Sequence, residues 1–163
     1  MAQHPKLTKF RKKAHATSGK HFFRFHSLSL FTLGVLLLWI VLYCFSDPNK
    51  HAGSFFGNAI ADWSGSLVII VATKYFLERD SEESRPPGGH LKNKVLDFIY
   101  GHSLSIFLLI TGGLWLWLYL RMDANSRWGQ VVGNIVSEWV QTLGLVWMTK
   151  FMLERGSKES RKC

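Results

Sequence analysis

Two segments of this chain carry polar side chains at helical spacing within largely apolar sequence. The first set is Asn58, Asp62, Ser66 and Thr73, and the second set is Asn134, Glu138, Thr142 and Thr149. Steps of four, four and seven residues keep each set on one face of an α-helix. A carboxylate inside a membrane span is costly and commonly marks an ion or proton pathway. Each set is therefore a candidate ion pathway, in which Asp62 and Glu138 would attract cations.

The same polar stripe also allows a structural role. Lys74 and Lys150 are expected to anchor the cytoplasmic interface by extending their ammonium groups toward water. Asp62 would then lie about 18 Å along the helix from Lys74, about 10 Å below the outer boundary of a 30 Å apolar core. Trp63 and Trp139 would be anchors at the outer interface. Asp62 could then face interfacial water or cap a helix start, or the stripe could join helices by hydrogen bonds.

The sequence contains no pattern typical of metal binding or catalysis. Of seven histidines, only His26 and His102 occupy equivalent places, each just before an apolar segment. The chain contains no His-x-x-x-His helix pair, no glycine-rich phosphate loop and no nucleophile elbow. The sequence therefore predicts no enzyme, no metal site and no cofactor.

The segment 26–85 is repeated at 102–161 without a gap. At a constant offset, 26 of the 60 positions are identical, where an apolar-biased composition would give roughly six by chance. The chain is therefore interpreted as a tandem duplication of one unit. Each unit ends in Thr-Lys followed by Leu-Glu-Arg, and Glu78 lies four residues after Lys74, a spacing that allows a weak ion pair on a helix.

The apolar residues are distributed as membrane spans. The chain has 163 residues, of which 47% are hydrophobic, and the segments 27–46 and 103–120 carry no charged residue. About 20 apolar residues cross the roughly 30 Å hydrocarbon core as a helix. Each unit adds a second segment, at 55–73 and 131–149, that reaches this length if one acid is included. The predicted fold is an all-α integral membrane protein with four transmembrane helices in two tandem hairpins of the same orientation.

The basic residues predict the topology. Of the 20 Lys and Arg residues, 17 lie before the first span, around the central linker or after the last span. By the positive-inside rule, both termini and the linker are cytoplasmic, in a multipass protein of the inner cell membrane. The two hairpins would then be related by a pseudo-two-fold axis along the membrane normal. With a formal charge of +9, the protein is expected to contact anionic lipid head groups. The positive-inside rule already accounts for the basic N-terminal segment, so no nucleic-acid partner is expected.

Four segments follow from this topology. They are a basic cytoplasmic N-terminal segment at 1–25, hairpin repeat 1 at 26–85, a cytoplasmic linker at 86–101 and hairpin repeat 2 at 102–161. Pro86-Pro87-Gly88-Gly89 breaks the helix at the start of the linker. The apolar residues within 92–100 predict a short interfacial helix that leads into the third span.

The ends of both repeats carry a resemblance. Lys-Tyr-Phe-Leu-Glu-Arg-Asp-Ser-Glu-Glu-Ser at 74–84 and Lys-Phe-Met-Leu-Glu-Arg-Gly-Ser-Lys-Glu-Ser at 150–160 resemble the hairpin ends of a group of small bacterial four-helix membrane proteins. Members of that group have an Arg-x-Gly-Ser-x-Glu-Ser pattern after a helix like Glu138-Trp139-Val-Gln141. The resemblance implies a four-helix membrane fold, but it implies no activity. Phe45-Ser46-Asp47 and Arg79-Asp80 give a fainter similarity to low-affinity iron permease-like proteins, whose Asn- and Thr-rich helix is absent here.

Two functions fit these features. The first is an oligomeric cation channel or transporter, because two hairpins per chain would give four around a central pathway in a homodimer. The alternative is a non-transporting membrane scaffold or accessory subunit that is held by lipid and a protein partner. Flux measurements on pure protein in liposomes would distinguish the two.

Overall fold

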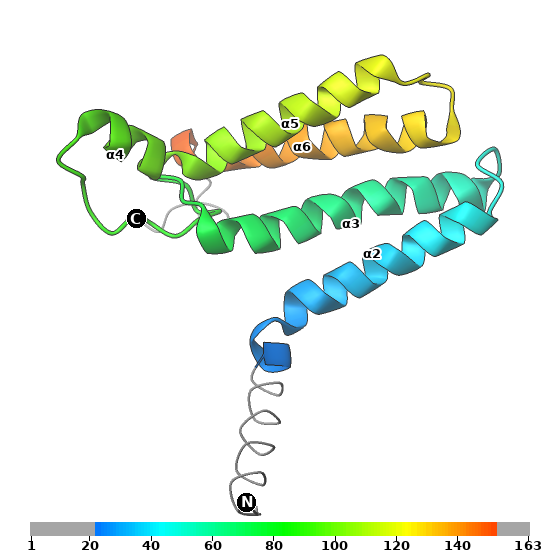
Figure 1. The fold of residues 1–163 in the computed structure, drawn as a ribbon, viewed down its shortest axis with the longest axis horizontal. Helices are drawn as coiled ribbons and strands as arrows, with labels where there is room; N and C mark the ends of the chain where they lie inside the picture. The colour runs from blue at the N-terminus through cyan, green and yellow to red at the C-terminus, as the bar shows by residue number, and fades with distance from the viewer. Residues whose placement is uncertain (1–21, 153–163) are drawn as a thin grey trace, which may run out of the picture.

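The computed structural model describes residues 22–152, and these are helical apart from the connections between helices, of which the longest is 76–93 (Figure 1). After a helical turn at 22–25 come five helices. They are α2 (Ser27–Phe45), α3 (His51–Tyr75), α4 (Lys94–Gly101), α5 (Ser103–Arg121) and α6 (Arg127–Phe151). The prediction of an all-helical chain is confirmed for this part of the molecule.

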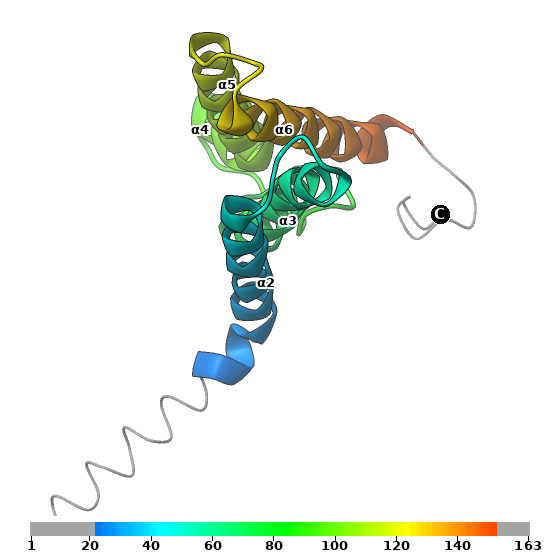
Figure 2. The same cartoon turned by 90° about the vertical axis from the view of Figure 1, so that its right-hand side faces the viewer.

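The long helices form two hairpins that pack through their second members. The helix α2 packs against α3, α5 packs against α6, and α3 packs against α6 in the centre. Figure 2 shows α3 and α6 as the inner helices, with α2 and α5 outside them. Each long helix of the second hairpin begins and ends 76 residues after its counterpart in the first. The inner helices are therefore the elements that carry the two polar stripes.

Both hairpins turn in the same way. The backbone N–H of Asn49 donates to Asp47 Oδ1 at 3.0 Å, and that of Asn125 donates to Asp123 Oδ1 at 2.9 Å. A side chain at Gly53 would place its Cβ 2.0 Å from the Asp47 carbonyl oxygen. The same clash would arise at Gly129, so the repeat needs glycine at this place.

Three of the long helices are long and apolar enough to cross a membrane. Among the described residues they are α2, α3 and α5. The helix α6 has the same length as α3, 25 residues, but it is more polar. It carries Gln130, Ser137 and Gln141 where α3 has serine, alanine and glycine. The structure is thus that of a helical protein with three candidate spans, which is compatible with a multipass membrane protein.

The contacts between the hairpins differ from those of the expected pseudo-two-fold arrangement. The Tyr43 hydroxyl donates to the Arg127 carbonyl oxygen at 2.7 Å, and Tyr43 packs edge-on against Trp128. Within residues 22–152, the counterpart hydrogen bond from Tyr119 to His51 is not formed. The first hairpin therefore uses one surface against the second hairpin, and the second uses a different one.

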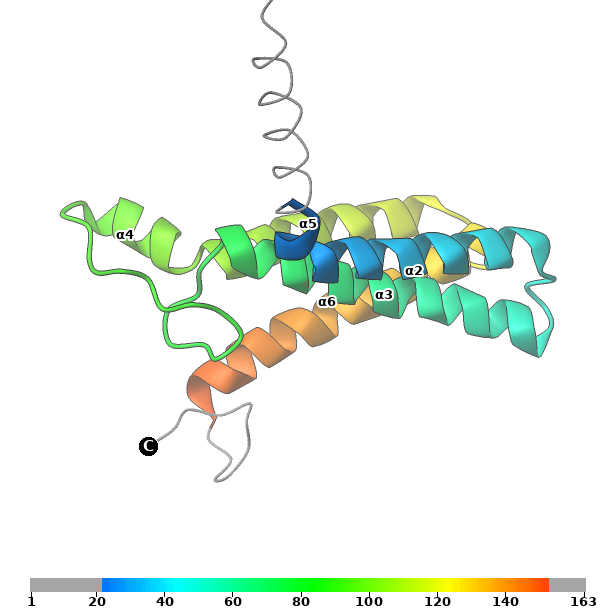
Figure 3. The same ribbon diagram turned by 90° about the horizontal axis from the view of Figure 1, so that it is seen from below.

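The linker contains the short helix α4, at the place where the sequence predicts one. Figure 3 shows α4 beyond the end of the bundle at which α5 begins. The Asn93 side chain caps α4 by accepting from the backbone N–H groups of Val95 and Leu96. Arg79 donates to both carboxylate oxygens of Asp97, at 3.1 and 3.2 Å. Arg79 and the Leu91 backbone N–H hold the pKa of Asp97 well below its usual range.

Candidate functional site

The two polar stripes meet along the contact between α3 and α6. The side-chain amide of Asn134 donates to Asn58 Oδ1, so two counterpart residues of the repeat touch each other. One turn further along, the Asp62 and Glu138 side chains lie close enough to each other to interact. We call this line of contacts the polar seam. It contains four of the eight residues that the sequence predicts as an ion pathway or an intramembrane polar stripe, namely Asn58, Asp62, Asn134 and Glu138.

The carboxyl pair lies near the middle of the inner helices. Asp62 is the twelfth residue of α3, which begins at His51, so it caps no helix start. The Asp62 side chain is exposed, whereas Glu138 is half-buried. A Cβ at Gly65 would lie 3.3 Å from Glu138 Oε2. The absence of a side chain at Gly65 thus leaves room for the Glu138 carboxyl group at the helix contact.

Two pockets with polar residues in their lining lie on either side of the carboxyl pair. The pocket toward the α5–α6 loop, of about 510 Å³, is lined by Ser54, Asn58, Tyr119, Ala124, Gln130, Gly133 and Asn134. The pocket toward the central linker, of about 170 Å³, has a mixed lining: Ser66, Glu83, Glu138 and Thr142 together with Gly65, Ile69, Leu145 and Val146. Members of both predicted stripes therefore line space that water or an ion can enter, and the carboxyl pair lies between the two pockets.

The last member of each stripe leaves the seam. Thr73 Oγ1 donates to the carbonyl oxygen of Ile69 in its own helix at 2.7 Å. Thr149 is buried, and its hydroxyl lies 3.0 Å from Ser81 Oγ in the segment after α3. These two threonines lie outside the two seam pockets.

The tryptophans differ from the predicted interface anchors. Trp139 is buried at the centre of α6, and its indole N–H donates to Thr111 Oγ1 at 2.9 Å. Its ring lies against Gly112, where a Cβ would be 3.2 Å from Trp139 Cδ1. This is a packing position between α5 and α6, which does not fit an anchor at an outer interface. Trp63 is half-buried at the matching place in α3.

The end of the bundle near the linker contains a cluster that sequence reasoning placed differently. The helix α3 ends at Tyr75, so Glu78 is not on a helix with Lys74 and the ion pair predicted from their spacing is wrong. Glu78 crosses to the second hairpin, where Oε1 lies 3.0 Å from Lys150 Nζ and 2.7 Å from His102 Nδ1. The backbone N–H of Ser105 donates to Glu78 Oε2 at 3.2 Å.

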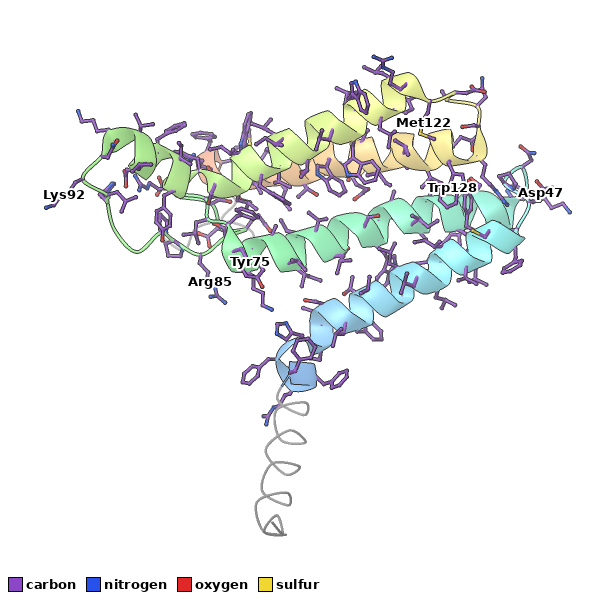
Figure 4. All side chains as sticks on the ribbon, viewed as in Figure 1. Asp47, Tyr75, Arg85, Lys92, Met122 and Trp128 are labelled. Carbon is purple, nitrogen blue, oxygen red and sulfur yellow. The ribbon has the colours of Figure 1, made fainter. Side chains whose placement is uncertain are left out.

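The electrostatics of Glu78 follow from these contacts. Its side chain is 1% exposed. Burial raises the pKa of Glu78, but the hydrogen bonds from His102, Ser105 and Lys150 together outweigh it and lower the pKa below the usual value. The sequence repeats His, Lys and Glu in both copies, and this repetition was a signal for the cluster. It did not show which copy supplies the partner of each residue. Figure 4 shows Tyr75, Arg85 and Lys92 at this end, with Asp47 and Trp128 at the opposite end.

The described residues hold no group of three or more His, Cys, Asp or Glu side chains that could bind a metal ion. Comparison of the chain with protein-family models, curated proteins and solved structures gave no significant match. The site is therefore interpreted from its own geometry.

Proposed function

We propose that this protein is a homodimeric cation channel or transporter of the inner cell membrane, with its pathway along the polar seam. The observation that carries this proposal is the pair of carboxyl groups at the centre of the inner helices. Asp62 is exposed there, and two pockets with polar residues in their lining adjoin the pair. A charged side chain at membrane depth is tolerated where it faces water or a polar interior, and a ring of carboxylates attracts cations.

The proposal includes α6 as a fourth span. A helix of 25 residues is about 37 Å long, more than the roughly 30 Å hydrocarbon core. The helix α6 packs between α3 and α5, both apolar enough to cross a membrane, so its polar residues need not face lipid. The matching helix bounds of the two halves support an origin by duplication.

The proposed topology places both termini and the linker in the cytoplasm. The support is the charge distribution and the position of Lys74 and Lys150 in the last turns of α3 and α6. Lys74 is exposed, as an anchor at the lipid head groups requires. Lys150 is half-buried, and its ammonium group donates to Glu78. Val95, Leu96, Phe98 and Ile99 of α4 are exposed, which suits a helix at the membrane surface in contact with lipids.

Cation flux into liposomes that contain only the purified protein tests the pathway. The double variant Asp62→Asn with Glu138→Gln should lower the flux by about tenfold, which corresponds to about 1.4 kcal/mol of lost attraction. The variant Asp62→Glu keeps the charge and should have a smaller effect. Equal amounts of folded protein are compared, and selectivity is measured with different cations.

A matched control neutralises another pair of acids that the repeat places at equivalent positions. Asp47→Asn with Asp123→Asn removes two charges from the loops, and an asparagine oxygen can still accept the turn hydrogen bonds. This variant should conduct like the wild type. Unchanged flux in the seam variant would exclude Asp62 and Glu138 from the pathway. A wild-type protein without flux for any cation would favour the scaffold or accessory-subunit function.

A further inference from the structure

The contact between the two hairpins of one chain is directional. At the loop end, the Arg127 side chain donates to the Tyr43 carbonyl oxygen at 2.9 Å, and the guanidinium lies 4.9 Å from the centre of the Tyr43 ring. At the linker end, the rings of Phe76 and Phe107 stack with their centres 4.5 Å apart. The first hairpin thus presents one surface, which we call the leading surface, marked by Tyr43, Phe76 and Glu78.

The second hairpin receives these side chains on another surface, which we call the receiving surface. Its marker residues are Leu104, Phe107, Arg127 and Lys150. Leu104 is fully buried, and its backbone N–H donates to the Leu77 carbonyl oxygen at 3.0 Å. Lys150 pairs with Glu78. The contact therefore joins two different surfaces of the repeated unit, which is the definition of a heterologous interface.

The repeat provides each of these surfaces twice, and the described markers of the second pair are exposed or half-buried. On the first hairpin, the receiving surface carries Leu28 and Phe31, which are 62% and 66% exposed. On the second hairpin, the leading surface carries Met152 at the place of Phe76, and Met152 is 65% exposed. A two-fold relation within the chain would have brought Met152 against Phe31. In the part of the chain that the structure describes, this leaves one exposed leading surface and one exposed receiving surface, which we call the free surfaces.

We propose that a second copy of the chain covers both free surfaces. The leading surface of each second hairpin would dock on the receiving surface of the partner's first hairpin, so that the contact seen within the chain is repeated twice between copies. A heterologous contact that closes generates a ring, here of four hairpins from two chains. The apolar residues at both free surfaces suit association between membrane helices through close packing.

The seam supports the same arrangement. Within the chain, Gly65 of α3 meets Glu138 of α6. The counterparts in the opposite sense, Gln141 and Asp62, are both exposed. The ring would bring them together between copies and enclose the polar seam among four inner helices. This inference rests on the proposed homodimer and specifies which surfaces form it.

Cross-linking of introduced cysteines tests the surfaces directly. In full-length protein with Cys44 and Cys163 changed to serine, the pair Phe31→Cys and Met152→Cys is treated in native membranes with an oxidant or a short bifunctional thiol reagent. We expect a product with twice the mass of the 18.7 kDa chain. A product of single-chain mass, linked internally, would overturn the proposal because the free surfaces would then meet within one chain.

Two matched pairs complete the experiment. Phe76→Cys with Phe107→Cys occupies the equivalent positions inside the chain, so it should link within one chain and thereby report that the hairpins are folded. Phe45→Cys with Met152→Cys lies at opposite ends of the bundle and should give no product. Absence of the Phe31–Met152 product when the internal pair links would overturn the proposal. Cation flux is measured separately, so a ring without flux would reject the pathway while retaining the dimer.

Discussion

The two hairpins share a sequence pattern and helix bounds, yet corresponding residues have different surroundings. Leu104 is fully buried, whereas Leu28, the same residue type at the equivalent position, is 62% exposed. Lys150 binds the buried Glu78, whereas Lys74 is exposed. The difference follows from position along the chain, because the first hairpin has a neighbour on its leading side and the second has one on its receiving side.

Contacts inside each hairpin, in contrast, are repeated closely. His26 Nδ1 lies 2.9 Å from Lys74 Nζ, and His102 Nδ1 lies 3.3 Å from Lys150 Nζ. A Cβ at Gly57 would lie 3.2 Å from the ring of Tyr43, and the counterpart position, Gly133, is equally close to its own tyrosine. The hairpin is thus the conserved structural unit of the two repeats, and the differences arise where the hairpins meet.

The largest expected effect compares the two lysines. Lys150→Met leaves Glu78 buried without its ammonium partner, and breaking a buried pair from one side typically costs about 3 kcal/mol or more. Lys74→Met removes an exposed charge and should cost under about 1 kcal/mol. The free energy of unfolding of both variants is measured by denaturant titration in detergent. Equal losses would show that the asymmetry between the hairpins does not exist in solution.

Much of the architecture was accessible from the sequence because it depends on local patterns. Apolar runs indicated the helices, and the step of four residues from Asn58 to Asp62 placed them on one face of α3. The partners across the bundle were not accessible. Helical spacing suggested Lys74 as the ion-pair partner of Glu78. In the structure, α3 ends at Tyr75 and Glu78 contacts the second hairpin instead.

The position of Trp139 was missed for a similar reason. Its expected depth, near the outer boundary of the apolar core, suggested an interface anchor. In the structure, the lack of a side chain at Gly112 creates the space for its ring, and Thr111 accepts from its N–H. A partner on a different helix cannot be read from spacing along one helix. The role of the seam in ion transport stays a prediction.

The second prediction compares the two leucines. Leu104→Ala removes a fully buried side chain between the hairpins and should cost about 2–4 kcal/mol through the cavity that it leaves. Leu28→Ala should cost less than about 0.5 kcal/mol in a dilute, monomeric detergent sample. In a dimeric sample the effect of Leu28→Ala should increase, because the proposed ring buries this residue. A Leu28→Ala effect that is independent of protein concentration would speak against the ring.

The smallest expected effect concerns the pH dependence of the same contact. The pKa of Glu78 is raised by burial but lowered overall by His102, Ser105 and Lys150. The folded chain therefore binds a proton at Glu78 less readily than the unfolded chain, so acidification favours unfolding. The stabilising contribution is complete above the ordinary glutamate pKa of about 4.3. It is lost as the pH falls through the lower value of the folded protein.

Glu78→Gln isolates this contribution from those of the other acids, including Asp97, whose pKa is also lowered. Thermal unfolding midpoints of the wild type and Glu78→Gln are compared in detergent from neutral pH to about pH 3, below the ordinary glutamate pKa. The wild type should be more stable at neutral pH, and the difference should narrow as the pH falls. A difference that stays constant over this range would mean that the Glu78 carboxylate gains no net stabilisation from the second hairpin. The contact between the hairpins would then depend on packing at Leu104 and Phe107, and the two free surfaces would have to associate through their apolar residues alone.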